Sequence, residues 1–133
     1  MTYEEIRTAI TARTGTFNGI ERARIDYQNA IGAVFAPPLT GLWCRMTIQH
    51  ATAFFAGMAD RPHSRKPGQI VFQCFARPRS GMKSLNDLTD ALEAHFGYWS
   101  AGDLECMEAS QVVVGDDGNG FYQINVNIRF RAG

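Results

Sequence analysis

The sequence predicts an α+β fold, in which a twisted antiparallel sheet of about four to five strands carries two helices packed on one face. Several segments alternate apolar and polar side chains with period two, which is typical of strands with one buried face. Strands that are neighbours in sequence usually pair antiparallel. The 133 residues suit one hydrophobic core, so we expect a single domain over residues 1–133.

The first helix is predicted from the signals at its two ends. Thr2 and Glu5 form a capping box, and Gly15 suits the position that follows a helix. These signals predict a helix over residues 3–14.

The second helix is predicted from its apolar stripe. Ser84 is expected to cap it, with Asp87 at the third helical position, and Gly97 is expected to stop it. Apolar side chains recur along this segment at three- and four-residue steps, at Leu85, Leu88, Leu92 and Phe96.

The strands are predicted from alternation and from turn residues. A short strand is expected at residues 25–27, and longer ones at 42–49, 70–77, 104–114 and 121–131. The last two are joined by a turn rich in Asp, Asn and Gly, so they form a hairpin. Residues 56–68 contain several Gly, Pro and basic residues, which predicts an exposed connection between two strands.

The cysteines and histidines give no sign of an active site. Cys44 and Cys74 lie on the apolar sides of neighbouring strands. We therefore expect both to be thiols in the core rather than a metal-binding or disulfide pair. His50 lies about 20 Å along the strand from Cys44, which prevents a nucleophile–base pair within that strand. We therefore expect no enzyme activity, no metal site and no cofactor.

The composition argues against a nucleic-acid-coating role, because 13 basic and 13 acidic side chains give zero net charge. No apolar run is long enough to span a bilayer, and the acidic N-terminus is unlike a signal peptide, so synthesis in the cytoplasm is expected.

Two surfaces are candidates for function. The first is a basic stretch with aromatic neighbours, which suits phosphate binding, solvated loop charge or docking of a protein. Its residues are Phe54, Phe55, Arg61, Arg65 and Lys66, with Arg77 and Arg79 nearby. The second is the polar side of the last strand, which either faces water or lines an assembly: Gln123, Asn125, Asn127, Arg129 and Arg131.

Six segments follow one another in a defined order along the chain. They are the helix from Met1-Thr2-Tyr3-Glu4-Glu5, Phe35-Ala36-Pro37-Pro38, Leu42-Trp43-Cys44-Arg45, Gly68-Gln69-Ile70-Val71-Phe72-Gln73, the helix at 85–96 and Tyr122-Gln123-Ile124-Asn125-Val126. In this order the chain resembles the tail terminator proteins of long-tailed phages, a family similar in architecture to the lambda tail terminator.

The resemblance implies a structural virion protein that forms a homo-hexameric ring. Such a ring caps the head-proximal end of the tail tube, ends tube polymerisation and binds head-completion (neck) proteins on its other face. DNA passes only through the lumen, no membrane is involved, and the protein belongs to the tail or neck of a virion assembled in the host cytoplasm.

Three other hypotheses compete with this one. The first is another phage neck adaptor or a tail-tube subunit, which polymerises instead of stopping as a ring. The second is a small α+β ligand-binding module, which is monomeric or dimeric. The third is a hydrolase that uses Cys74 or Cys44, although no base or orienting group accompanies either thiol.

Overall fold

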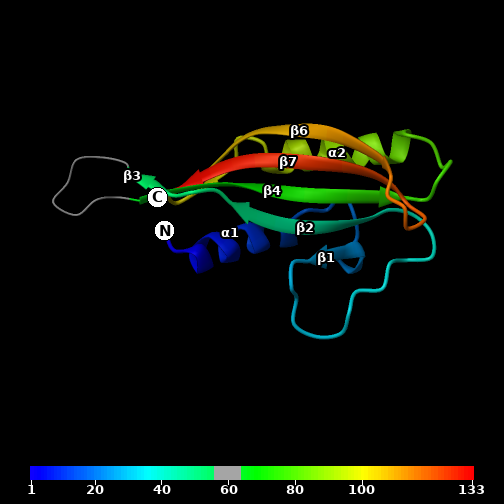
Figure 1. Cartoon of the computed structure of the whole chain (residues 1–133), viewed down its shortest axis with the longest axis horizontal. Coiled ribbons are helices and arrows are strands. Elements are labelled where there is room, and N and C mark those ends of the chain that lie inside the picture. Colours follow the sequence, from blue (N-terminus) through cyan, green and yellow to red (C-terminus); the bar gives the residue numbers. More distant parts are fainter. Residues whose placement is uncertain (56–63) are drawn as a thin grey trace.

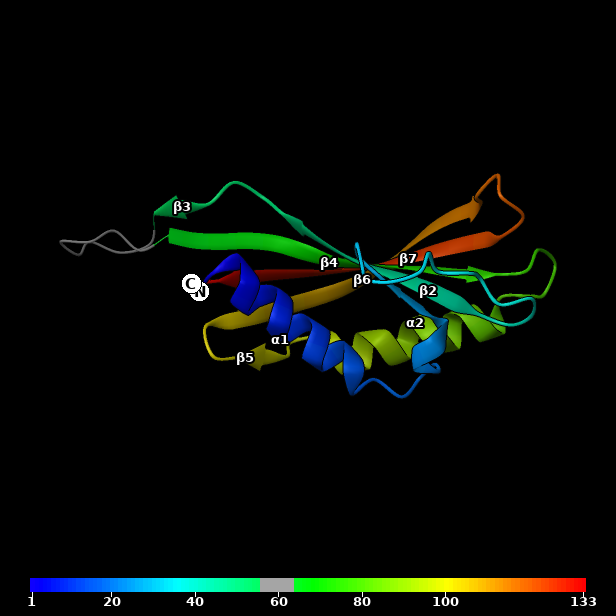
Figure 2. The ribbon, with the colours of Figure 1, turned by 90° about the horizontal axis from the view of Figure 1, so that it is seen from below.

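The computed structural model describes residues 1–55 and 64–133, which form a curled sheet with two helices on one side (Figures 1 and 2). Six strands cross the sheet in the order β1-β2-β4-β7-β6-β5. Their bounds are β1 Ile25–Tyr27, β2 Trp43–His50, β4 Ser64–Ala76, β7 Tyr122–Ala132, β6 Leu104–Asp116 and β5 Ser100–Ala101. The α+β class is confirmed. The predicted four to five strands are too few, because a strand as short as β5 leaves no alternation to detect.

The sheet is mixed rather than wholly antiparallel. β1 pairs with β2 in parallel, whereas β2, β4, β7 and β6 form an antiparallel series. Residues 28–42 connect β1 to β2, and this length allows the chain to return to the same end of the sheet before β2 begins. The rule that sequence neighbours pair antiparallel therefore fails at this one pair.

Both helices pack on the same face of the sheet, as predicted (Figure 2). α1 spans Tyr3–Gly15 and α2 spans Lys83–Phe96, and the 3₁₀ turn η1 at Arg22–Arg24 precedes β1. One core joins the two layers. Its fully buried members from the helices are Ile6, Ile10, Leu85, Leu92 and Phe96, and those from β4 and β7 are Ile70, Phe72, Cys74, Ile124 and Ile128.

The two helix starts differ from each other. The capping box of α1 is present, since the Thr2 hydroxyl accepts from Glu5 N at 3.0 Å and the Glu5 carboxylate accepts from Thr2 N at 3.0 Å. The expected Ser84 cap of α2 is wrong, because the helix begins two residues earlier, at Lys83, with Met82 at the N-cap. Gly81, with φ +86°, turns the chain into the helix at this point.

The predicted connection over residues 56–68 is wrong from residue 64 onward, because β4 begins at Ser64. The short strand β3, Phe54–Phe55, pairs with Ser64 and Arg65 outside the six-strand path. Pro67 is tolerated in β4 because its carbonyl accepts from Ala51 N at 2.9 Å, a bond that needs no N–H from proline.

The hairpin between β6 and β7 is confirmed. Asp116 and Asp117 accept hydrogen bonds from Gly118 N and Asn119 N at 2.9 and 2.7 Å, and Gly118 and Gly120 have positive φ. These bonds within the turn account for its acidic residues.

Candidate interaction site

The basic residues predicted as one stretch are separated by the whole length of β4. Arg65 and Lys66 lie near its start, whereas Arg77 and Arg79 follow its end, so about 40 Å of strand divides the two pairs. Arg61 lies outside the described residues. The structure therefore does not bring Arg77 and Arg79 together with Arg65 and Lys66, because the segment between the two pairs is an extended strand.

At the end of β4, the Arg77 side chain is held by contacts with its own chain. Its guanidinium lies 4.6 Å from the centre of the Phe121 ring, and one of its terminal nitrogens donates to Pro38 O at 3.0 Å. Phe121 belongs to an aromatic cluster with Phe35, Trp43 and Phe75, in which Trp43 stacks on Phe75 at 4.1 Å. The cluster holds the connection 28–42 against this end of the sheet.

Asn125, Asn127 and Arg129 lie on the side of the sheet that carries no helix, here called the helix-free face. They are flanked across the strands by Gln49, Gln69, Gln73, Thr47 and Ser110. Gln69 donates to the Gln49 side chain at 2.8 Å, and Gln123 donates to Asn125 at 2.8 Å. The face is thus rich in amides that already bond to one another.

The arginines of the helix-free face are paired with carboxylates. Arg129 lies 3.1 Å from Glu108, and Arg131 lies 3.0 Å from Glu105. Arg45 pairs with Asp26 at 3.0 Å and also packs over Trp43. The helix-free face is therefore polar without a surplus of positive charge from these residues.

Sequence reasoning missed the connection over residues 28–42, here called the apolar loop. It contains no ionisable side chain, and Ile31, Val34 and Leu39 are 105%, 95% and 88% exposed. Arg24 fixes its far end by donating to Thr40 O and Leu42 O at 2.8 and 3.1 Å. A loop of this length with no helix or strand is usually either a functional segment or a linker, and its lack of charged residues is a signal visible in the sequence.

The margin of the sheet formed by β6, opposite the margin formed by β1, also exposes apolar side chains. Val112, Val113 and Val114 of β6 are 45%, 56% and 48% exposed. β5 and the residues before it pair with β6 only as far as Met107, so within the described residues the outer edge of β6 has no strand partner beyond that point. Unpaired N–H and C=O groups of this kind are templates for another strand.

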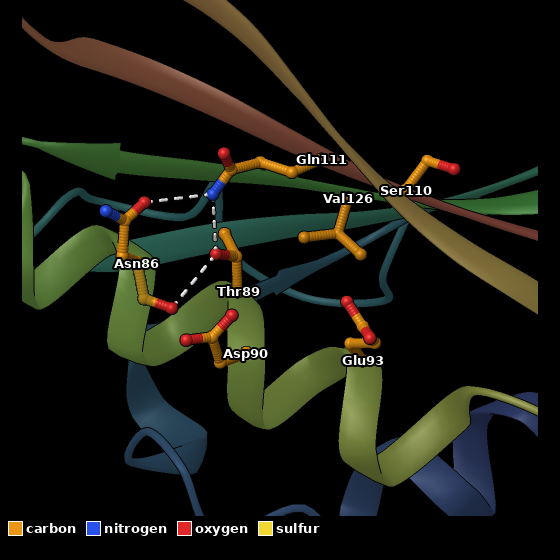
Figure 3. Close-up of a pocket in the computed structure, with 7 residues that line it drawn as sticks. All are labelled: Asn86, Thr89, Asp90, Glu93, Ser110, Gln111 and Val126. Carbon is orange, nitrogen blue, oxygen red and sulfur yellow. Dashed lines mark hydrogen bonds between the residues drawn. The ribbon is translucent and has the colours of Figure 1, made fainter.

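A hollow of about 330 Å³ lies between α2 and β6 (Figure 3). Gln111 donates across it to Asn86 Oδ1 at 3.0 Å and to Thr89 Oγ1 at 2.8 Å. Asp90 and Glu93, from successive turns of α2, line the same hollow, and neither forms an ion pair with a described residue. This hollow is therefore acidic.

The three cysteines are buried free thiols, and Cys44 and Cys74 are direct cross-strand partners, which confirms the core-thiol prediction. Burial raises the pKa of Cys44 to about 12 and that of Cys106 to about 11, and it also raises the pKa of Cys74. His50 pairs with Gly68 at the other end of β4, far from Cys74, so no Cys–His pair forms across the strands.

Residues 1–55 and 64–133 contain no group of three His, Cys, Asp or Glu side chains able to hold a metal ion. In the same part of the chain, neither helix has the length and apolarity required to cross a bilayer.

The fold and its surfaces define a class, namely a small α+β protein with a mixed curled sheet and two helices on one face. No family model matches the chain, and no curated protein matches it in sequence. Among solved structures, one chain whose name describes no function superposes with a TM-score of 0.71 at 18% sequence identity. The match covers 100% of this chain and 96% of the other, and it supports the fold alone.

Proposed function

We propose that this protein is a structural subunit that forms a ring on the head-proximal end of a phage tail tube, ends tube growth and joins the tail to the neck proteins. The order of its segments resembles the tail terminator family, as described above. The observation that carries the proposal is the helix-free face, which lies on the side of the sheet opposite both helices.

The chemistry of the helix-free face suits the lumen of such a ring. In a ring built by placing sheets side by side, one sheet face points inward and the helices point outward. The amides Gln69, Asn125 and Asn127 are neutral, and the nearby arginines are paired with glutamates. A lumen lined in this way is wetted but releases no counterions from DNA, so DNA passes without tight binding.

The zero net charge is compatible with self-association, because copies approach without long-range repulsion. A protein that ends a tube must bind the tube on one ring face and must not bind a second ring there. Two chemically different ring faces meet that requirement.

The test has two stages. Native mass spectrometry of the purified chain over a range of concentrations should give a closed hexamer as the largest species. Electron microscopy should then show that the chain shortens tubes assembled from the tail-tube protein encoded in the same genome. A monomer that leaves tube length unchanged would overturn the proposal, and open-ended polymers of the chain would favour a tail-tube subunit.

One observation favours the ligand-binding module as a second candidate. A hollow of about 650 Å³ lies beside α1 and β1, between Thr11, Tyr27 and Met46. The Tyr27 hydroxyl is protonated at neutral pH, and burial raises its pKa further, so it can donate a hydrogen bond. A stable monomer whose melting temperature rises with small apolar ligands would support this candidate.

A further inference from the structure

The outer edge of β6 is regular over one short stretch. β6 pairs with β7 with two register shifts, one between Cys106 and Ala109 and one between Val113 and Gly115. Between them, residues 109–113 follow residues 128–124 of β7 without interruption. Irregularities protect the edges of many sheets, whereas this stretch offers evenly spaced groups to an added strand. We call residues 109–113 the open edge.

The apolar loop lies on the other side of the sheet from the open edge (Figure 1). β6 lies near one margin of the sheet, while the apolar loop leaves β1 at the opposite margin. A contact between the two within one chain is therefore excluded, whereas a contact between two copies is not.

The side chains at the two margins suit each other. Ile31 and Val34 are almost fully exposed and have no apolar cover within the described residues. Val112 and Val113, which belong to the open edge, are half exposed. Burying these groups against one another removes apolar area from water at both margins. The apolar loop contains no charged side chain that would be desolvated by this contact.

The charges flanking the two margins are also complementary. Asp90 and Glu93 line the hollow beside the open edge without an ion-pair partner among the described residues. At the other margin, the Arg22 guanidinium lies near Tyr27 of β1, the residue before the apolar loop, and its hydrogen bond among the described residues goes to a backbone carbonyl, Gly15 O, at 3.2 Å. Opposite charges at the rim of a contact steer association and fix its orientation.

From these observations we propose that the open edge of one copy receives residues 30–34 of the apolar loop of a second copy, as an added strand, while Phe35 stays in the aromatic cluster of its own chain. The contact is heterologous, since each copy uses a different margin, and its repetition gives a ring when the rotation between copies closes. This inference deepens the proposed function by naming the surfaces that join neighbouring subunits, and it depends on that proposal only for the closure of the ring.

Paired cysteine substitutions test the contact directly. Val34→Cys is combined in turn with Val112→Cys, Val113→Cys and Val114→Cys, and each protein is oxidised and run on a non-reducing gel. The native cysteines are buried, so they do not contribute to cross-links. Residues opposite one another on paired strands lie within disulfide range.

The inference expects at least one double variant to give a ladder of covalent dimers, trimers and larger species. Each single variant should remain monomeric under the same conditions, because the contact brings residue 34 to β6 and not to another residue 34. Double variants that cross-link no further than the single variants would overturn it. Single β6 variants that dimerise efficiently would also overturn it, since they would indicate a symmetric edge-to-edge contact.

A matched pair of substitutions provides a second test that does not depend on the register. Val113→Lys places a charge at the open edge and should weaken self-association by about tenfold or more. Val113→Thr keeps the shape and the strand preference, so it should associate nearly as the unchanged chain does. Thermal unfolding of both variants checks that the fold is retained, and equal association of the two would contradict the inference.

The two proposals fail in different ways. If ladders form but tail tubes keep growing, the contact stands and the tube-capping function fails. If the unchanged chain caps tubes but no double variant gives a ladder, the function stands and this contact fails.

Discussion

Gly68 in β4 is the position where the packing of the sheet allows a quantitative prediction. A Cβ added to Gly68 would overlap the carbonyl oxygen of Gln49 and lie 2.6 Å from Cζ of Phe130. Overpacking of this kind costs about 1–3 kcal/mol, and because a backbone oxygen cannot rotate away, the upper half of that range applies. Alanine recovers roughly 0.5–1 kcal/mol through the unfolded chain, which leaves a net loss of about 2 kcal/mol for Gly68→Ala.

Chemical denaturation with urea measures this loss as a lower midpoint with an unchanged slope. Gly81→Ala is the control, because its Cβ would meet nothing within 4 Å and only its φ of +86° is strained. In a Phe130→Leu background, Gly68→Ala should cost less by roughly 0.5–1 kcal/mol, since part of the overlap is removed. Wild-type stability for Gly68→Ala would refute the packing of β2, β4 and β7 at this point.

Three further predictions concern chemistry and helix contacts. Burial keeps the three cysteine thiols protonated. A thiol reagent at neutral pH should therefore modify none of them in the folded chain and all three in denaturant. Rapid labelling of the folded chain would contradict this. Partial burial also lowers the pKa of His50 below its ordinary value of 6.5, so the unfolded state binds the proton more readily. The resulting stability is present above about pH 6.5 and is lost as the pH falls through the folded pKa. Urea titrations at about pH 7.5 and about pH 5.5 measure how much unfolding free energy is lost between the two pH values. This loss should be smaller for His50→Gln than for the unchanged chain, and equal losses would show that His50 is not its source. Finally, Arg13 donates through Nε and a terminal nitrogen to His95 O at 3.1 and 2.6 Å, joining α1 to α2. Arg13→Lys keeps the charge but loses the paired hydrogen bonds of the guanidinium. Calorimetry should show that the free energy of unfolding falls by about 1 kcal/mol, whereas an unchanged value would mean that the contact is absent in solution.

The sequence predicted those elements whose signals are local. The capping box at Thr2, the leucine stripe of α2 and the alternation of β7 each depend on nearby residues, and each element is present. The start of β4 was missed because Pro67 and Gly68 resemble a loop. Only the neighbouring segments explain them, since Ala51, the residue after β2, supplies a donor to the Pro67 carbonyl and β7 places Phe130 over Gly68.

The candidate surfaces were harder to predict than the fold. Arg65 and Arg77 are close in the basic pattern of the sequence, but an extended strand places them far apart. The open edge of β6 is a property of pairing, so no single residue signals it. The apolar loop did leave a trace in the sequence, as a long run without charge between two elements.

The unlike margins of the sheet have a genetic consequence. In an assembly joined through them, a chain altered only in the apolar loop still offers its open edge and is recruited by normal copies. It then presents a defective margin to the next subunit and halts the assembly. Alleles of this kind should be dominant, and a chain altered at both margins should be recessive, since it joins nothing.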